Sequence, residues 1–259
     1  MLSLDRVVRR GSQQSHHIPL PWVGLQRLGF GLAKGQLGMV AAAPGVGKSA
    51  LALQMALSSG LRTLYISADT DAWTMTVRTL ASITGHPQSY ITTCLEGGYN
   101  ADDMAIALLD AAHVQFSFDT YSMSDIRDDV MAYAVIHGAY PEMICVDNLM
   151  NVARGGEDDL SSQTKAMDEL HAVAQMTGAH VLVLHHATGH YDDGDKRIPL
   201  SGLANKLSKL PAQVLTMYRK DPYVHLCVVK NRQGQANPGG GMEVRLRFDP
   251  ERMRFMDVE

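Results

Sequence analysis

The chain has 259 residues, of which 46% are hydrophobic and 19% are charged, so it is an ordinary globular chain rather than a disordered or fibrous one. A formal net charge of −4 argues against coating nucleic acid by bulk charge, but not against a local basic path. The three cysteines, an odd number, exclude a disulfide framework and favour a reducing compartment. No apolar run approaches the roughly 18 residues of a membrane-spanning helix, and the N-terminus lacks a signal-peptide core. We therefore expect a cytoplasmic protein with no membrane partner.

One break in composition divides the chain. The segment Gly11–His17 is polar and rich in turn formers, and it separates a short basic helix candidate, Leu2–Arg10, from the rest. From Pro19 onward the apolar pattern is continuous. We predict an N-terminal arm over residues 1–17 and one domain over residues 18–259.

Short apolar runs alternate with helical spacing along this domain. The predicted strands, each with the pattern of a strand buried on both faces, are Leu37–Ala43, Thr63–Ser67, Met143–Val146, Val181–Leu184 and Ala212–Met217. The predicted helices are Ser49–Ser58, Asp71–Thr84, Ala101–Ala112 and Ser161–Thr177. This alternation predicts an α/β fold with a mainly parallel, twisted sheet and flanking helices. The runs Val224–Lys230 and Glu243–Phe248, joined by a Gly/Pro turn, predict a C-terminal antiparallel hairpin.

The most specific motif is the segment Ala42–Ser49, A-A-P-G-V-G-K-S, between a predicted strand and a predicted helix. That is the context of a phosphate-binding loop (P-loop). Gly45 and Gly47 allow backbone N–H groups to turn toward phosphates, and the helix N-terminus adds positive partial charge. Lys48 reaches the β- and γ-phosphates, and Ser49 binds Mg²⁺ through its hydroxyl. We expect the ATP-binding residues to be Ala43, Pro44, Gly45, Val46, Gly47, Lys48, Ser49 and Ala50.

Carboxylates follow two other predicted strands. Asp147 ends the apolar run Met143–Val146, at the edge of an open α/β sheet where ligands gather, and we predict that it binds Mg²⁺ together with Ser49. Asp69 and Asp71 follow the strand that ends at Ser67 and are the candidates for activating water, with Asp69 expected to point toward the nucleotide. Asp71 is more typical of a cap for the following helix.

The histidines after the strand Val181–Leu184 allow three interpretations. His185, beside the γ-phosphate edge, suits a sensor of phosphate state. The spacing of His185, His186 and His190 could also indicate a metal site, but successive strand residues face opposite sides, which disfavours one ion between the first two. Equally, His185 and His186 could be strand-end residues without a role in chemistry.

Together these motifs resemble the C-terminal ATPase domain of DnaB-type replicative helicases, within the RecA-like group. The similarity extends over residues 18–257, and its landmarks occur in the family's order. They are Pro21-x-Val-Gly-Leu-x-x-Leu-x-x-Gly-x-x-Lys-Gly, Leu64-Tyr-Ile-Ser-Ala-Asp, Met75-x-x-Arg78-x-Leu-Ala-Ser, Val146-Asp147-Asn-Leu-Met, Val183-Leu184-His185, Tyr218-Arg219 and Val229-Lys230-x-Arg232-x-Gly. The resemblance implies an ATP-hydrolysing DNA helicase or translocase of stand-alone phage or plasmid type. It also implies a homo-oligomer, a hexameric ring with ATP sites at subunit interfaces, acting on single-stranded DNA in replication or recombination.

Two basic residues near the C-terminus carry a further implication of the resemblance. Lys230 and Arg232 are two apart in a predicted strand, so both face one side. In the family such a pair reaches the γ-phosphate of the neighbouring subunit as an arginine finger, which makes ATP turnover depend on assembly. The alternative is two solvated basic residues on a hairpin edge.

Family likeness also suggests two DNA-contacting loops. These are Val152–Ser162, which contains Arg154, and Gly189–Gly202, which contains Lys196 and Arg197. Both loops carry more acidic than basic residues, unlike strong single-strand binders. The DNA contact is thus an analogy to the family rather than a deduction from charge.

Departures from the family pattern keep two alternative functions open. Asp69 stands where the family has glutamate, which predicts slow hydrolysis, and Ala42 replaces the first glycine of the loop. One alternative is a filament-forming ATPase of the recombination-mediator kind. The other is a nucleotide-dependent scaffold with little hydrolysis.

Overall fold

The computed structural model describes residues 17–18, 20–118, 122–152, 160–187, 189–203 and 207–258, so the predicted helix Leu2–Arg10 and nearly all of the predicted arm lie outside it. Its elements in chain order are β1 (His17–Ile18), α2 (Val23–Arg27), β2 (Leu32–Ala33), β3 (Leu37–Ala42), α3 (Lys48–Ser59), β4 (Thr63–Ser67), α4 (Ala72–Thr84), α5 (Gln88–Gly97), α6 (Ala101–Leu109), β5 (Val114–Ser117), α7 (Met123–His137), β6 (Met143–Asp147), α8 (Leu149–Val152), α9 (Leu160–Thr177), β7 (His180–His186), η1 (Gly189–Tyr191), η2 (Leu200–Gly202), β8 (Gln213–Lys220), β9 (Tyr223–Asn231), β10 (Glu243–Asp249) and β11 (Arg254–Asp257). Within these ranges, no helix has the length and apolar character needed to cross a membrane.

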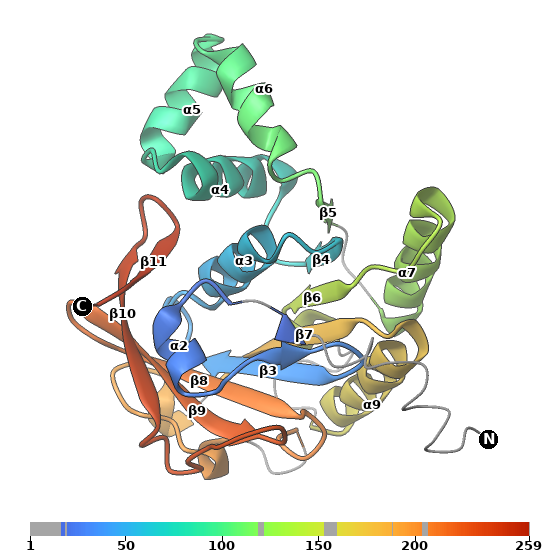
Figure 1. The fold of residues 1–259 in the computed structure, drawn as a ribbon, viewed down its shortest axis with the longest axis vertical. Helices are drawn as coiled ribbons and strands as arrows, with labels where there is room; N and C mark the ends of the chain where they lie inside the picture. Colours follow the sequence, from blue (N-terminus) through green and yellow to red (C-terminus); the bar gives the residue numbers. More distant parts are fainter. Residues whose placement is uncertain are drawn as a thin grey trace.

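The main sheet of the described residues has nine strands in the order β11-β10-β9-β8-β3-β7-β6-β4-β5. From β8 to β5 all neighbours are parallel, and from β8 to β11 all are antiparallel. Figure 1 shows the antiparallel strands, in orange and red, at one side of the sheet. The predicted parallel α/β sheet and its C-terminal hairpin, β9–β10, are therefore confirmed, and β11 extends the hairpin by one more strand.

The central strand β3 explains why its sequence is apolar at every position. Val40 and Ala42 belong to the core that packs on α3, whereas Leu37, Met39 and Ala41 belong to the core on the other face, under α7 and α9. All six residues of β3 are buried, as expected for a parallel strand covered on both faces. The two layers of helices hold the strand ends in fixed positions.

Most of the residues predicted to have functional roles lie along one edge of the sheet. Strands β3, β4, β6 and β7 run in the same direction, so their carboxyl ends meet at this edge. The register pairs Ser67 with Asp147 and Ala42 with His186, which brings the last residues of all four strands into line. The strand ends predicted to carry functional groups are thus neighbours in space.

Helices α4, α5 and α6 enclose a small core of their own, and α5 and α6 project from the body of the molecule in Figure 1. The sequence predicted α4 and α6 but not α5, α7 or β5. Helix α5 buries only Ile91 and Cys94, so the apolar stripe that would mark it in the sequence is narrow.

His180, at the start of β7, is a fully buried titratable side chain. Its ring is fully buried, with Nδ1 2.9 Å from the carbonyl oxygen of Ala33 and no partner for Nε2 in the described parts of the chain. The carbonyl oxygen can only accept, so Nδ1 carries the proton. Burial lowers the pKa of His180 from 6.5 to about 4.

We therefore expect His180 to reduce stability as the pH falls. Between about pH 6.5 and 4 the unfolded chain binds a proton that the folded chain resists, so the free energy of unfolding decreases with falling pH, by up to about 3 kcal/mol. The variant His180→Asn keeps an N–H donor but cannot titrate, so its stability should fall less over this range. Urea denaturation at several pH values measures the difference, with the exposed His190→Asn as control. Equal pH slopes for wild type and His180→Asn would contradict this expectation.

Candidate nucleotide-binding site

The loop between β3 and α3 has the shape that phosphate binding requires. Gly45 and Gly47 have φ angles of +75° and +108°, and Gly47 caps the N-terminus of the 12-residue helix α3. A Cβ atom at Gly47 would lie 3.0 Å from Cζ of Phe255, so glycine suits both the backbone and the space. Ala42 ends the extended strand β3 and has no positive φ, so alanine is tolerated where such loops usually have glycine.

The side chain of Lys48 is hydrogen-bonded to the backbone of its own loop. Its side chain is buried, and Nζ donates hydrogen bonds to the carbonyl oxygens of Ala42 at 3.0 Å and Ala43 at 2.9 Å. Nζ also lies 3.1 Å from Nδ1 of His186. Burial lowers the pKa of Lys48 to about 8, against the opposing effect of nearby aspartates, so the ammonium is still mostly charged at neutral pH. A compact cation therefore stands at the helix N-terminus, where anionic phosphates bind.

Asp147 supplies a buried carboxylate beside the loop. Its side chain accepts hydrogen bonds from the Tyr65 hydroxyl, at 3.0 Å, and from the Ser49 hydroxyl. Burial raises the pKa of Asp147, and the hydrogen bonds from Ser49 and Tyr65 oppose this effect. A carboxylate and a hydroxyl side by side are hard oxygen ligands of the kind that Mg²⁺ prefers. The residues predicted for Mg²⁺ thus fit the ion in chemistry and placement.

Of the two candidates for activating water, Asp69 lies at the site and Asp71 does not. Asp69 accepts a hydrogen bond from Nδ2 of Asn148 at 2.6 Å and another from Nδ2 of Asn151. Asp71 accepts from the backbone N–H of Thr74 at 2.9 Å, so it caps α4, as the sequence indicated. The two asparagine side chains fix the direction of the Asp69 carboxylate.

The pleat of β7 corrects the interpretation of the histidine pair. His186, and not His185, lies beside Lys48, and its Nε2 is 3.3 Å from Nδ2 of Asn148. His185 alternates to the other face of the strand, on the side of Val183, because successive residues face opposite ways. Since the Lys48 ammonium can only donate, Nδ1 of His186 accepts and Nε2 carries the proton. The Asn148 amide nitrogen also donates, so its approach to Nε2 is a contact and not a hydrogen bond. Burial and the charge of Lys48 both lower the pKa of His186, which favours this neutral form.

These groups surround one cavity of about 280 Å³. Its lining residues are Gly45, Gly47, Lys48, Ser49, Ala50, Asp69, Arg78, Asp147, Asn148, His186, Phe248 and Met253. Three of the loop residues predicted to bind ATP do not line it: Ala43 and Val46 are buried in the core and Pro44 is exposed. Sequence reasoning had not assigned a role to Asn148, although it directly follows Asp147. No local signal marks Phe248 or Met253, which the C-terminal strands bring to the loop.

Lys230 and Arg232 share a contact that places them on one side of β9. Nζ of Lys230 donates to the carbonyl oxygens of Ser208 at 2.7 Å and Lys209 at 2.8 Å, and Nη2 of Arg232 donates to the carbonyl oxygen of Lys209 at 2.9 Å. Burial, and then the charge of Arg232, lower the pKa of Lys230 to about 8. The common acceptor fits the spacing of two residues along a strand.

The register of the sheet separates this pair from the chain's own phosphate loop. Asn231, between the two cations, pairs with Gln213, which in turn pairs with Gly38 of β3. Gly38 precedes Ala42, where the strand reaches the phosphate loop, by four residues, or about 13 Å of strand. Lys230 and Arg232 thus lie toward the opposite edge of the sheet.

The residues expected to contact DNA divide into three cases. Arg154 lies outside the described residues. The exposed Lys196 has Nζ 3.8 Å from Oδ2 of Asp193. Arg197 donates from Nη2 to Oε2 of Glu243 at 2.9 Å, so its charge is already paired within the chain.

Comparison with known proteins places the chain in a family. The AAA domain family matches residues 25–190, which is more than half of the chain. The Gene 65 protein of Mycobacterium phage L5 is 36% identical over 250 residues, covering 92% of this chain and 93% of that protein. The Gene 65 protein of Mycobacterium phage D29 is 35% identical over 230 residues, covering 85% and 99% respectively.

Two solved structures share the fold. The first is an ATPase domain, which matches with a TM-score of 0.80 at 16% identity, over 99% of this chain and 96% of that one. A DnaB-like replicative helicase, described with its interactions with primase, matches with a TM-score of 0.81 at 16% identity, over 99% of this chain and 65% of the helicase. The chain thus spans just under two thirds of that helicase. The chain is a P-loop NTPase of the AAA domain family, with the RecA-like fold of DnaB-like helicase ATPase domains.

Proposed function

We propose that this protein is the ATP-hydrolysing, Mg²⁺-dependent motor of a ring-forming, DnaB-like DNA helicase or translocase. It acts on single-stranded DNA in replication or recombination, in the cytoplasm. The observation that carries the proposal is the separation of charges across the sheet. Lys48 stands at the carboxyl edge, whereas Lys230 and Arg232 lie toward the opposite edge. A ring brings the second set of cations of one subunit to the phosphate loop of the next.

Within one subunit, the loop residues have distinct roles. The backbone N–H groups of residues 45–50 hold the phosphates, and the Lys48 ammonium contacts the terminal ones. Ser49 and Asp147 hold Mg²⁺, which, when bound, neutralises charge on the phosphate oxygens. Tyr65 keeps the Asp147 carboxylate in place through its hydroxyl.

Asp69 is the group that we propose accepts the proton of the attacking water. Asn148 and Asn151 orient its carboxylate by hydrogen bonds from their amides. His186 takes the role of phosphate sensor that the sequence had given to His185, because it accepts a hydrogen bond from Lys48 and lies beside Asn148, which donates to Asp69. The proposed sensor thus lies between the loop and the proposed general base.

Replacing Asp69 with asparagine should lower ATP turnover by about 100-fold or more while preserving nucleotide binding, because an amide of similar size cannot accept the proton. Phosphate release under saturating ATP measures turnover, and titration with a fluorescent nucleotide measures affinity. Asp71→Asn is the matched control, since that side chain caps α4. If Asp69→Asn turns over ATP at the wild-type rate, the general base is another group.

The ring and the DNA contact are tested together. We propose that single-stranded DNA binds to the loops that contain Arg154 and Lys196. We also propose that the arm over residues 1–17 packs on the adjacent subunit through Leu4, Val7 and Val8. ATP hydrolysis should increase with single-stranded DNA, and mass photometry with ATP should show a hexamer. Duplex DNA and single-stranded RNA serve as controls. If single-stranded DNA neither binds nor stimulates hydrolysis, the proposed motor is excluded.

One observation favours a nucleotide-dependent scaffold as a second candidate. The Asp69 side chain is one methylene shorter than glutamate, and each of its oxygens accepts a hydrogen bond from an asparagine. Both features limit its reach toward water. The same assays separate the two functions, because a scaffold assembles with ATP but shows no turnover with any nucleic acid. Helical filaments instead of closed rings in negative stain would favour a recombination-mediator-like ATPase.

A further inference from the structure

The segment of residues 189–203, which follows the sensor strand β7, touches the phosphate loop directly. Gly194 is buried, and a Cβ atom there would lie 2.8 Å from Cγ2 of Val46 and 3.3 Å from Cβ of Ala43. The carbonyl oxygen of Gly194 accepts a hydrogen bond from the backbone N–H of Arg219 at 2.7 Å. The segment therefore packs between the loop and β8, at a point where no side chain fits. Because this packing is tight, a shift of Val46 would displace the segment.

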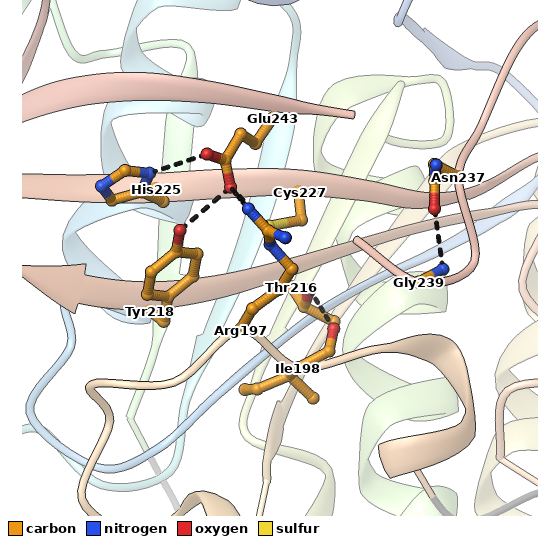
Figure 2. A network of polar contacts seen from close by, with 9 residues as sticks. All are labelled: Arg197, Ile198, Thr216, Tyr218, His225, Cys227, Asn237, Gly239 and Glu243. Carbon is orange, nitrogen blue, oxygen red and sulfur yellow. Dashed lines mark hydrogen bonds and ion pairs between the residues drawn. The ribbon is translucent and has the colours of Figure 1, made fainter. Parts of the chain in front are cut away.

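Arg197 anchors the same segment to β10 a few residues later. Its Nη2 donates to Oε2 of Glu243 at 2.9 Å, and the Tyr218 hydroxyl donates to the same carboxylate at 3.0 Å (Figure 2). Nδ1 of His225 lies 3.3 Å from the other oxygen of Glu243, and the His225 ring stacks on that of Tyr218. Burial acts to raise the pKa of Glu243, but the hydrogen bonds from Arg197 and Tyr218 outweigh it and lower the pKa, so the carboxylate stays charged.

Packing supports this anchor on both sides. The stem of Arg197 lies against the β9–β10 connection, because a Cβ atom at Gly240 would be 2.8 Å from its Cγ and Cδ. Asn237 shapes that connection by accepting a hydrogen bond from a backbone N–H two residues on, as Figure 2 shows. The next residue, Ile198, is fully buried, and its carbonyl oxygen accepts from the Thr216 hydroxyl at 2.8 Å. Arg197 is thus held in place by the ion pair of its guanidinium, by the packing of its aliphatic carbons and by the burial of Ile198.

We propose that a change in the conformation of the phosphate loop shifts the segment 189–203, because Gly194 packs against Val46 of the loop. Arg197 is a positioning residue that anchors this segment to Glu243 through their ion pair. Between the two anchors Lys196 is exposed, so the anchors set its place relative to the bound nucleotide. Arg197 is then an internal tether and not a cation for DNA. The inference rests on the proposed function, since it requires the loop to bind nucleotide.

Hydrogen exchange of the full-length protein, with and without a non-hydrolysable ATP analogue and Mg²⁺, tests the tether. In the wild type, the analogue should slow exchange in both 43–50 and 189–203. In Arg197→Gln, loss of a charge-assisted hydrogen bond should speed exchange in 189–203 about tenfold and abolish its response, while 43–50 still responds. Glu243→Gln should do the same, and the double variant should be no worse than either single one. Arg127→Gln, which removes an exposed ion pair with Glu169 on other elements, is the control.

The outcomes distinguish this inference from the proposed function. If 189–203 does not respond to the analogue in a wild-type protein that binds it, or if Arg197→Gln responds like the wild type, the inference is overturned. If the two single effects add in the double variant, the tether through Glu243 is wrong. Failure of the wild type to bind the analogue would overturn the proposed function, and this inference with it. Failure of single-stranded DNA to stimulate hydrolysis, with the exchange response intact, would remove the motor but leave the tether.

Discussion

Replacing Lys48 with alanine is expected to reduce ATP turnover by about 1,000-fold or more, because it removes the ammonium that is hydrogen-bonded to the phosphate loop. The Lys48 ammonium uses three contacts at once, to two carbonyl oxygens of the loop and to Nδ1 of His186. Its loss also leaves the buried Asp147 carboxylate with less positive charge nearby. Nucleotide affinity should therefore fall as well.

Turnover is measured by phosphate release and affinity by calorimetry, with thermal unfolding as a check on the fold. Lys48→Arg is the informative second variant. It keeps the charge, but a planar guanidinium cannot reproduce the compact geometry of three converging contacts, so we expect turnover to stay low. Substantial hydrolysis by a folded Lys48→Ala protein would mean that the phosphates bind elsewhere.

The second large effect is expected from Arg232→Ala, which should lower turnover of the assembled protein by roughly 1,000-fold or more while nucleotide binding persists. The reason is position. Arg232 lies beyond the end of β9, toward the edge of the sheet opposite its own loop, so in the proposed ring it would stabilise transition-state charge on the neighbouring subunit. In the described structure its side chain donates to the carbonyl oxygen of Lys209, a contact that it can exchange for a phosphate oxygen.

Single-turnover hydrolysis at saturating ATP separates this loss from a binding defect, and mass photometry shows whether the oligomer still forms. Arg245→Ala, which removes an arginine stacked 5.9 Å from the ring centre of Tyr223 on the neighbouring strand, is the matched control and should keep wild-type turnover. Normal turnover by an assembled Arg232→Ala oligomer would contradict the role of Arg232 as an arginine finger. Arg232 would then be a solvated cation on a hairpin edge.

Local patterns predicted much of the fold and the centre of the site. The loop around Lys48 could be identified because glycine, lysine and serine must stand at fixed spacing between a strand and a helix. Asp147 could be found because four buried apolar residues precede a carboxylate. The parallel sheet followed from strands that alternate with helices, and the capping role of Asp71 from its place before α4.

What the sequence did not reveal depends on contacts between distant segments. The choice between His185 and His186 depends on which face of β7 meets the loop, and that is set by packing on both sides of the sheet. Phe248 reaches the cavity because β10 and β11 fold back toward the loop from the far end of the chain. The pairing of Arg197 with Glu243 joins residues 46 positions apart, and neither carries a motif.

The most direct test of the central claim, that each ATP site is completed by the neighbouring subunit, is turnover by a mixture of Lys48→Ala and Arg232→Ala proteins. Each variant alone should be inactive. In mixed oligomers, verified by co-purification through a tag on one variant, roughly one boundary in four joins an intact phosphate loop to an intact Arg232, so turnover should return to a measurable fraction of the wild-type rate. Mixed oligomers that remain as inactive as the two single variants would contradict the shared site.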